Sequence, residues 1–316
     1  MFENEKNSVK ADKNFIHVCI VCGNNQFKFI FSDFDKYVEA SKKKFSIYKC
    51  IKCQLITIDP KILEKEFDTY YPKNYIPFKL EKKKETYLKS IGKNLRDLVV
   101  NLFDIDKVKL ELNKFKYYKI KYLDFGCGNS KHLIYIRSQY PKWELYGYDK
   151  SEFSRNNLKK NNFNLIDNFG NIPDNFFDII NLSSVIEHLE HPTEDIKLLK
   201  KKIKKEGVII IKTPNWKSFG RIIFRKNWIN YDIPRHIYIF SSKNLKKFLI
   251  DKGFKILRVN HSYNIGVELK SMYRALKIKK RPKIHNFLSK LFFPIGILIN
   301  LTAFSSTITI IGKRND

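Results

Sequence analysis

From residue 121 onward, short runs of β-branched and aromatic residues alternate with longer segments whose apolar residues recur every three or four positions. The first pattern predicts strands and the second predicts amphipathic helices. Strands that alternate with helices specify an α/β fold with a doubly wound, mostly parallel sheet. The expected strands are 121–125, 144–149, 163–167, 177–184, 208–212, 255–259 and 306–313, and the expected helices are 132–140, 151–161, 193–207 and 241–253.

Two of these helices carry end signals. Ser151 stands where it can cap the helix that follows it, and Thr193 stands in the same position before 194–206. Gly207 then predicts the end of that second helix.

The pattern also divides the chain into parts. Residues 1–14 are polar and we expect them to be disordered, and 15–78 hold a cysteine-rich module and an aromatic connector. Residues 79–116 have helical spacing and predict a linker or cap. The α/β domain then occupies 117–316, with an excursion at 262–304 between its last two strands.

The sequence LDFGCGNS at 123–130 places a glycine-rich turn directly after an expected strand. Gly126 and Gly128 let a ligand approach the backbone closely. Lys131 stands where the dinucleotide fingerprint needs its third glycine, and the P-loop pattern is missing as well. Ligands of doubly wound sheets bind beyond the carboxyl ends of the strands, where Asp149 can accept both hydroxyls of a ribose. The turn and the acid predict a site for a nucleoside that carries something other than a diphosphate.

Four of the five cysteines form two C-x-x-C pairs. Two such pairs supply the four thiolates of a closed, tetrahedral zinc site, and the β-prone runs 27–31 and 45–50 suit a hairpin around it. Disulfides or a redox pair are the alternatives; we see no secretion signal to favour the first, and two pairs argue against the second. We therefore expect structural zinc in a small zinc-ribbon-like β module. The ligands would be Cys19, Cys22, Cys50 and Cys53.

The net charge of +29 raises the question of an anionic partner. Most of the basic residues are lysines spread along the chain, which favours an ordinary solvated surface over a nucleic-acid interface, and an anionic membrane stays open as a third interpretation. The start of the chain has no apolar signal segment, and the apolar run 291–299 is shorter than the roughly 20 residues of a spanning helix. We expect a cytoplasmic protein, with peripheral contact at the inner face of a membrane as an open alternative.

Five stretches in this order resemble the class I S-adenosylmethionine-dependent methyltransferases: LDFGCGNS, YGYDKS, IPDNFFDIINLSSVIEHLEHP, GVIIIKTPN and DIPRHIYIFSSKNLKKFLIDKGF. The resemblance covers about residues 120–260 and implies a Rossmann-like fold and S-adenosylmethionine as cofactor. The C-x-x-C pairs ahead of the domain resemble zinc-knuckle methyltransferases of sugar, polysaccharide and secondary-metabolite pathways. A small-molecule acceptor of that kind is what the resemblance implies.

The same resemblance implies roles for individual residues near the donor. The backbone of Gly126, Cys127 and Gly128 would lie against the methionine part, and Asp124 would orient the turn and the donor's amino group. Ser130 departs from the family, because many members have a third glycine there. Asp149 would bind the ribose, Lys150 and Ser151 would lie beside the adenine, Asp167 and Asn168 compete for the adenine amino group, and Ser183 and Ser184 would line the methyl region. From its size we interpret the Cys127 side chain as packing.

The stretch VIEHLEHP at 185–192 follows the fourth strand and should face the transferred methyl group. His188 is the first candidate general base and Glu187 its orienting partner, although both could simply brace the next helix. His236 is the second candidate, in a loop that would roof the acceptor pocket. Some quinone O-methyltransferases that resemble this stretch hold a metal with an earlier acid. Ser184 and Val185 stand there, so we expect no catalytic metal.

Two other functions compete with this one. An RNA methyltransferase could use the zinc module and the lysines, but NLSS stands where a base-methylating motif would follow the fourth strand. A non-catalytic zinc adaptor would not need the glycine turn or Asp149. The apolar excursion could cover the sheet, a second copy in a homodimer, or an anionic membrane surface.

Overall fold

The computed structural model describes residues 18–36, 39, 42–62, 66–72, 111–278, 282, 284–300 and 302–315. The predicted disordered start at 1–14 and most of the predicted helical linker at 79–116 lie outside these residues.

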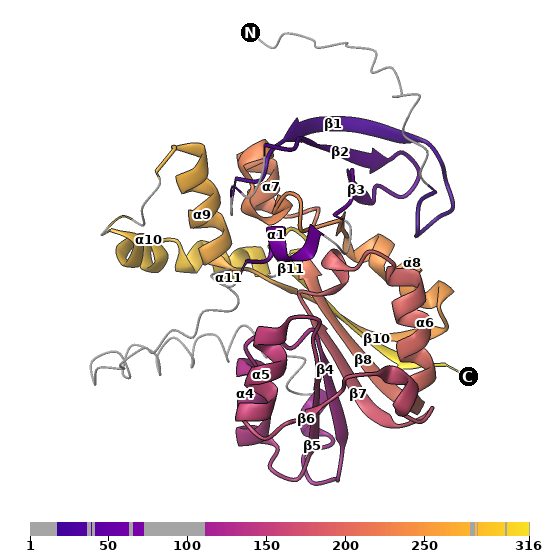
Figure 1. The fold of residues 1–316 in the computed structure, drawn as a ribbon. Coiled ribbons are helices and arrows are strands. Elements are labelled where there is room, and N and C mark those ends of the chain that lie inside the picture. The colour runs from indigo at the N-terminus through magenta and orange to yellow at the C-terminus, as the bar shows by residue number, and fades with distance from the viewer. Residues whose placement is uncertain are drawn as a thin grey trace, which may run out of the picture.

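A seven-stranded sheet forms the centre of the described structure, in the order β10-β11-β8-β7-β4-β5-β6 (Figure 1). Neighbours from β6 to β8 run parallel, whereas β11 runs antiparallel to both β8 and β10. The predicted α/β fold with a mostly parallel, Rossmann-like sheet is confirmed. The strands are β4 (Lys121–Phe125), β5 (Glu144–Tyr148), β6 (Asn164–Leu165), β7 (Phe177–Ser183), β8 (Ile203–Pro214), β10 (Phe254–Ser262) and β11 (Thr307–Arg314).

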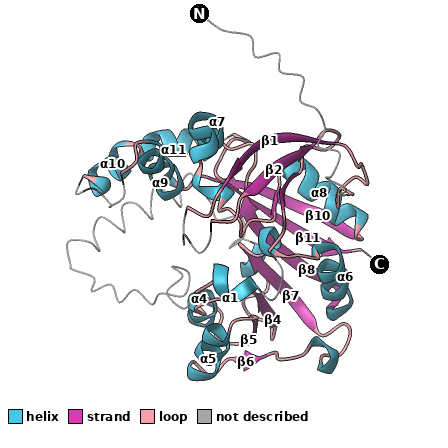
Figure 2. Ribbon diagram, turned by 45° about the horizontal axis from the view of Figure 1, so that its top comes forward, coloured by secondary structure: helices cyan, strands magenta, loops and turns pink. Residues whose placement is uncertain are grey.

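Helices flank this sheet on both sides. Figures 1 and 2 show α4 and α5 on one side and α6 and α8 on the other. Ser151 caps α5 by accepting a hydrogen bond from the amide of Ser154, as predicted, and Ser241 forms a capping box with Asn244 at the start of α8. The helices are α4 (Lys131–Gln139), α5 (Glu152–Lys160), α6 (Pro192–Lys202) and α8 (Ser242–Asp251).

The start of α6 differs from the prediction. The helix begins at Pro192, and His191 is at the N-cap position without a side-chain capping bond, so Thr193 is not the cap. Proline suits the first helical position because its missing N–H would have no partner there.

The end of α6 was also predicted wrongly. The helix stops at Lys202, and β8 then runs from Ile203 through Gly207. The buried Ile203 pairs with Phe177 of β7, so the sheet takes up residues that the lysine-rich pattern assigned to the helix.

A second, four-stranded antiparallel sheet lies at the N-terminal end, in the order β1-β2-β3-β9. β1 (Phe27–Asp33) and β2 (Phe45–Cys50) form the predicted hairpin. β3 (Ile56–Asp59) pairs on its other side with β9 (Tyr238–Ile239), which comes from the later part of the chain. One cluster of buried apolar side chains joins the two sheets, since it contains Phe45 of β2 as well as strand residues of β7 and β8.

The remaining helices lie mostly beyond one end of the large sheet (Figure 1). No helix among the described residues has the length and apolar character needed to cross a membrane. Several 3₁₀ turns complete the loops, among them η3 (Phe169–Asn171), η4 (Ile186–His188) and η6 (Ile229–Tyr231). The helices are α1 (Phe67–Tyr70), α7 (Phe219–Phe224), α9 (Ile265–Ala275), α10 (His285–Leu291) and α11 (Phe293–Asn300).

Candidate active site and metal centre

The glycine turn lies at the point where the strand order of the large sheet reverses. β4 has β5 on one side and β7 on the other, and all three run in the same direction. Their carboxyl ends therefore meet at one edge, which is where ligands of such sheets bind. The turn at Gly126, the acid Asp149 and the serines Ser183 and Ser184 all follow directly from these strands.

Both glycines of the turn have left-handed backbone conformations, with φ of 75° at Gly126 and 50° at Gly128. A Cβ atom at Gly126 would come within 2.5 Å of the Val185 side chain, whereas one at Gly128 would meet no protein atom within 4 Å. Gly126 is thus required by packing against the loop after β7. Gly128 faces open space, where a ligand can reach its backbone.

Two acids hold the turn in place. The amides of Gly128 and Ser151 donate to the carboxylate of Asp149, at 2.9 and 2.8 Å. Asp124 is buried and accepts a 2.8 Å hydrogen bond from the Asn181 side chain of β7. Burial raises the pKa of Asp124. Asn181 was not predicted as a site residue, because it reads in the sequence as one polar position within an apolar strand.

Aromatic rings pack against one another between the loops of the predicted donor site. Phe125, which precedes Gly126, stacks on Tyr148, which precedes Asp149, with ring centroids 4.8 Å apart. Phe169 lies 4.9 Å from Tyr148 in an edge-on arrangement. These rings fix the relative positions of three loops, and the sequence analysis did not single them out.

The other predicted donor residues differ in their surroundings. Asp167 is exposed and pairs with Arg155, whereas the Asn168 side chain accepts a hydrogen bond from the Gly170 amide at 2.7 Å. Lys150 is exposed beside the Ser151 cap. The choice between Asp167 and Asn168 for the adenine stays a prediction.

Cys127 and Ser130 belong to the turn itself. The Cys127 side chain is buried in an apolar cluster, which agrees with a packing role, and burial raises the pKa of its thiol. Ser130 is buried with φ of 58°. A left-handed conformation costs a non-glycine residue about 1–2 kcal/mol, which explains why a glycine is common at this position in the family.

Three side chains that can move a proton gather beside this turn. Glu187 and His188 lie on η4, immediately after Val185, and His236 comes from the loop before β9. One nitrogen or oxygen atom from each lies within 4.8 Å of the others. The two imidazole rings meet edge to face with centroids 4.6 Å apart. The structure thus brings together the three predicted catalytic candidates from two separate segments.

The hydrogen bonds of the two histidines indicate where their protons lie. Nδ1 of His188 is 3.0 Å from the Arg235 carbonyl oxygen, and Nδ1 of His236 is 2.7 Å from the Asn230 carbonyl oxygen. A carbonyl only accepts, so Nδ1 of each ring carries a proton. Nε2 of His236 lies 3.9 Å from a carboxylate oxygen of Asp232. The hydroxyl of Tyr71 also lies 3.0 Å from Nδ1 of His188 and was not predicted as a site residue.

Burial shifts the pKa values of His188 and Glu187 in this cluster. Burial, and then the neighbouring His236, lower the pKa of His188 to about 3. Burial also raises the pKa of Glu187. Oε2 of Glu187 accepts a 2.9 Å hydrogen bond from the Thr213 hydroxyl. Among the described residues, Oε1 of Glu187 has no hydrogen-bond partner. The three side chains are close enough to bind a metal ion, so the expected absence of a catalytic metal stays a prediction.

A buried arginine connects this cluster to the N-terminal sheet. Arg235 donates two 3.0 Å hydrogen bonds to the carboxylate of Asp35 and one of 2.6 Å to Asp232. Burial alone would raise the pKa of Asp232, but the charge of Arg235 holds this pKa below its usual value. Because Arg235 is held on both sides, the residue that follows it in the chain, His236, is held in position as well. No local pattern predicts this pair, because its two members are 200 residues apart in the chain.

The four predicted zinc ligands are also brought together. The sulfur atoms of Cys19 and Cys53 are 3.4 Å apart, those of Cys22 and Cys50 are 3.6 Å apart, and all four lie within 4.8 Å of one another. These separations exceed the roughly 2.05 Å of a disulfide. They suit the edges of a tetrahedron with metal–sulfur distances of about 2.3 Å.

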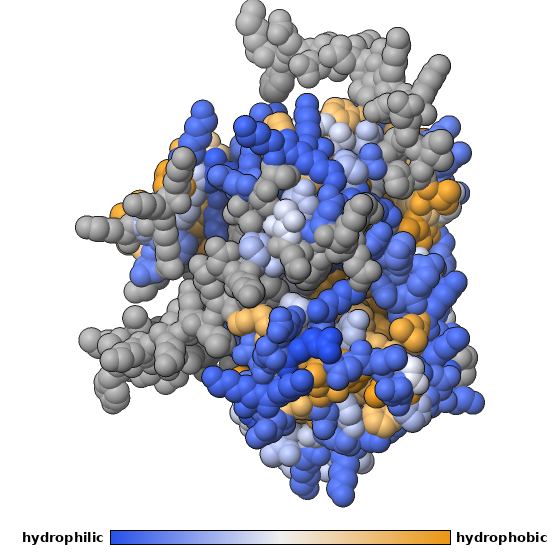
Figure 3. Space-filling view, viewed as in Figure 1, coloured by the Kyte–Doolittle hydropathy of each residue, from blue (hydrophilic) through white to orange (hydrophobic). Residues whose placement is uncertain are grey.

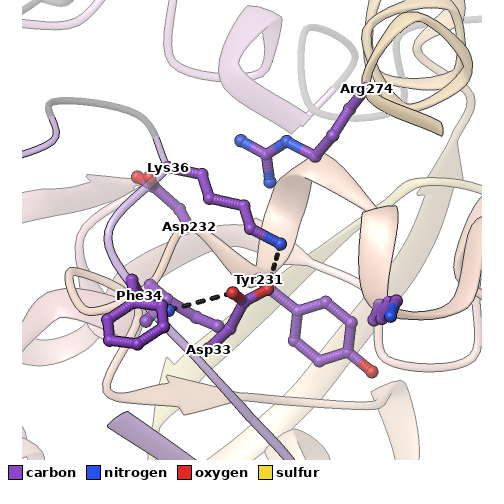
Figure 4. A pocket seen from close by; sticks show the side chains of 8 residues that line it. Asp33, Phe34, Lys36, Tyr231, Asp232 and Arg274 are labelled. Atoms are coloured by element: carbon purple, nitrogen blue, oxygen red, sulfur yellow. Dashed lines mark hydrogen bonds and ion pairs between the residues drawn. The ribbon is translucent and has the colours of Figure 1, made fainter. Parts of the chain in front are cut away.

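A small cleft lies elsewhere, where the end of β1 meets η6 and α9 (Figure 4). Lys36 pairs with Asp33 at its rim, and Arg274 and Asp232 also line it. None of the predicted donor residues lines this cleft, so it is distinct from the candidate active site.

Comparison with known proteins identifies the class of protein. Residues 87–259 match a family model described as a methyltransferase domain. The chain belongs to this methyltransferase family. The predicted S-adenosylmethionine-dependent activity and its cofactor are thereby confirmed, and the adaptor interpretation is set aside. The match does not identify the acceptor.

Solved structures similar to this methyltransferase include three with low sequence identity. A SAM-dependent methyltransferase from Archaeoglobus fulgidus is 21% identical, with 69% of this chain and 99% of that chain covered and a TM-score of 0.46. One from Aquifex aeolicus is 18% identical, with 68% and 91% covered and a TM-score of 0.42. Magnesium protoporphyrin IX methyltransferase from Synechocystis, solved with bound SAH, is 14% identical, with 79% and 97% covered and a TM-score of 0.47. None of the curated proteins compared with the chain matches it.

Proposed function

We propose that this methyltransferase transfers a methyl group to a small molecule, a sugar, polysaccharide or secondary-metabolite precursor, with His188 as the general base. The observation that carries the proposal is the contact between the His188 and His236 rings next to the glycine turn. Val185 contacts Gly126, and η4 begins at the next residue, so the donor turn and the base belong to one packed unit.

The donor would bind across the carboxyl ends of β4, β5 and β7. Its methionine part would lie against the open backbone at Gly128, and its ribose hydroxyls would donate to the remaining lone pairs of Asp149. Each carboxylate oxygen of Asp149 accepts only one of the two backbone hydrogen bonds described above, so both retain capacity. Ser183 and Ser184 would line the region of the methyl group.

The reaction would be an in-line displacement at the sulfonium methyl carbon. A lone pair of the acceptor forms the new bond to carbon, the S–CH₃ bond breaks, and its electrons stay on sulfur. Positioning supplies much of the rate enhancement because the donor is already activated. The acceptor's proton would pass to Nε2 of His188, which has a free lone pair because His188 is neutral at pH 7. A pKa of about 3 makes this imidazole a weak base, so the transfer requires stabilisation of the imidazolium that forms.

Glu187 and Tyr71 would support the base from two sides. The unpartnered Oε1 of Glu187 can stabilise positive charge that develops on either histidine. The hydroxyl of Tyr71 borders the same ring, and His236 supplies a second Nε2. Such a cluster suits an acceptor whose hydroxyl or acidic C–H must lose a proton.

We also propose that Cys19, Cys22, Cys50 and Cys53 hold one structural zinc ion. The residue after each C-x-x-C pair has a left-handed backbone: φ is 67° at Gly23 and 64° at Gln54. These turns direct two thiol groups each toward one point. A site filled by four protein ligands leaves no position for substrate, so the zinc would stabilise the N-terminal sheet.

One experiment tests the donor site and the acceptor class together. The purified protein is incubated with methyl-labelled donor and cell extracts fractionated into RNA, sugar nucleotides, lipids and small metabolites. We expect label in a small-molecule fraction, and loss of that label with Gly128→Ala, whose methyl group would enter the donor space without touching protein. Label in RNA, or full activity of Gly128→Ala, would contradict the proposal.

A further inference from the structure

The helices beyond the end of the sheet expose an unusual number of large apolar side chains. Phe287 and Leu291 of α10 are 65% and 56% exposed, and Leu298 of α11 is 66% exposed. We name this set the outer apolar face. Its members are Phe219, Ile222, Ile223, Leu276, Ile278, Ile284, Phe287, Leu291, Ile295, Leu298 and Phe304.

These residues belong to one connected part of the molecule. α7 packs against α9, α9 against α10, and α10 against α11. The amide of Phe219 at the start of α7 donates a 2.7 Å hydrogen bond to the carbonyl of Phe304, which follows α11. Figure 3, seen from the same side as Figure 1, shows apolar residues beside hydrophilic ones where α9 and α10 lie.

α11 exposes large apolar side chains, which a helix at a protein surface normally buries. Among its described side chains, only Gly296 is buried, and a Cβ there would come within 2.6 Å of the Tyr263 ring. Among the side chains of α11 that the structure describes, Ile295 and Leu298 are 47% and 66% exposed. A helix that is apolar on its outer side normally lies in a protein core or against lipid.

The segments that carry the outer apolar face are basic, and two acids outside them, Asp33 and Asp232, line the cleft beside Lys226 and Arg274. Segments 215–231 and 262–306 contain a single acidic residue, Glu268. It is buried, where it accepts a 2.8 Å hydrogen bond from Ser306. The exposed basic side chains in the same segments include Lys217, Arg225, Lys226, Lys270 and Lys277.

We propose that the outer apolar face binds the surface of an anionic membrane, with the apolar side chains in the headgroup boundary and the lysines and arginines on anionic headgroups. This combination of apolar and basic residues is that of an interfacial anchor. No described helix can cross a bilayer, so the contact is peripheral.

The charge pattern favours this occupant over two others. A symmetric dimer through this face would place each basic group opposite basic groups of the second copy, because such an interface is self-complementary. Nucleic acid would be bound through the cations, and the exposed Phe and Leu side chains would gain nothing from its phosphates. An anionic lipid surface satisfies both kinds of residue at once.

Vesicle co-sedimentation of the full chain tests the proposal. Vesicles of phosphatidylglycerol and phosphatidylcholine should bind the protein at low salt at least ten-fold better than pure phosphatidylcholine vesicles. The triple variant Phe287→Ser, Leu291→Ser, Leu298→Ser should lose this binding about ten-fold with an unchanged circular dichroism spectrum, since all three side chains are exposed. The double variant Lys270→Glu, Lys277→Glu should lose it as well.

Matched controls separate this face from the rest of the surface. Leu198→Ser with Ile250→Ser removes exposed apolar side chains from α6 and α8, and Lys159→Glu with Lys160→Glu reverses charges on α5. Both controls should bind vesicles as well as the unaltered protein. Equal binding by the face variants, or no preference for anionic lipid, would overturn the proposal. So would a dimer in sedimentation velocity that the triple variant dissolves. Membrane binding does not depend on the proposed acceptor or base.

Discussion

At the scale of single residues, the site combines groups that hold the backbone with groups that would meet the substrates. Asp149 fixes the Gly128 amide and is also the expected ribose ligand. Gly126 is held by Val185, so replacing it would disturb the turn before any effect on the donor could be measured. Gly128 and Asp149 are the positions at which donor binding can be tested, with two side effects. Alanine at Gly128 strains a backbone with φ of 50°, and Asp149→Ala also releases the Gly128 and Ser151 amides.

Asp149→Ala should weaken binding of S-adenosylhomocysteine by roughly 1.5–3 kcal/mol, about ten- to a hundred-fold, because charge-assisted hydrogen bonds are lost. Isothermal titration calorimetry measures this. Glu152→Ala removes an exposed acid near the start of α5 and is the matched control, with unchanged affinity expected. Unaltered affinity of Asp149→Ala would show that the donor lies elsewhere.

His188 should make stability depend on pH. Burial and then His236 lower the pKa of His188 to about 3, whereas an unfolded histidine titrates near about 6.5. Below the unfolded value the unfolded chain binds a proton that the folded chain does not, so stability falls as the pH falls toward 3.

The expected slope from this one proton is about 1.4 kcal/mol per pH unit. His188→Gln should remove it, so the difference in unfolding free energy between variant and parent should change between pH 7 and pH 5 in urea titrations. His191→Gln alters an exposed histidine and should leave the profile unchanged. A pH-independent difference for His188→Gln would mean that His188 is protonated normally in the folded protein.

At the scale of elements, most of the large sheet could be predicted, because its strands are short apolar runs bounded by turn residues and capped helices. The prediction of element boundaries failed where the pattern of a helix continues into the pattern of the following strand. The lysines of 200–205 continue the helical spacing past Lys202, yet Ile203 is already in the sheet. β9 has two residues and pairs with a strand far earlier in the chain, so no local pattern indicates it. Likewise, the sequence suggested both histidines separately but not their contact.

The two C-x-x-C turns predict a further result at this scale. Elemental analysis of protein prepared without chelator should give one zinc per chain, and Cys53→Ser should lower the zinc content well below one and lower the melting temperature. Cys127→Ser changes the fifth cysteine, outside the cluster, and should retain the zinc. A second zinc that is lost with His236→Ala would place a metal among the catalytic candidates and contradict the expectation of none.

At the scale of the whole molecule, the N-terminal sheet and the methyltransferase domain are one structural unit. The β3–β9 pairing joins them through the backbone, and the Arg235–Asp35 pair joins them through side chains that are both fully buried. Removing one partner of a buried pair leaves an uncompensated charge, which is far costlier than losing a surface pair.

Asp35→Asn should therefore lower the free energy of unfolding by up to about 3 kcal/mol, with Asp232 limiting the loss because it still pairs with Arg235. Urea denaturation measures the change. Asp33→Asn, two residues away, breaks a pair with the exposed Lys36 and should cost at most about 1 kcal/mol. Equal effects of the two substitutions would mean that the buried pair does not hold the domains together.

The β3–β9 pairing also has a consequence during synthesis on the ribosome. The first three strands of the small sheet leave the exit tunnel long before Tyr238 and Ile239 have been translated. Until then the β3 edge is unprotected, and such edges recruit other chains. We expect nascent chains that stop before Tyr238 to aggregate or to be retained by chaperones, whereas chains extended past Ile239 gain protease resistance in the N-terminal sheet. Because of this order of synthesis, the loop that carries His236 completes the sheet that is made first.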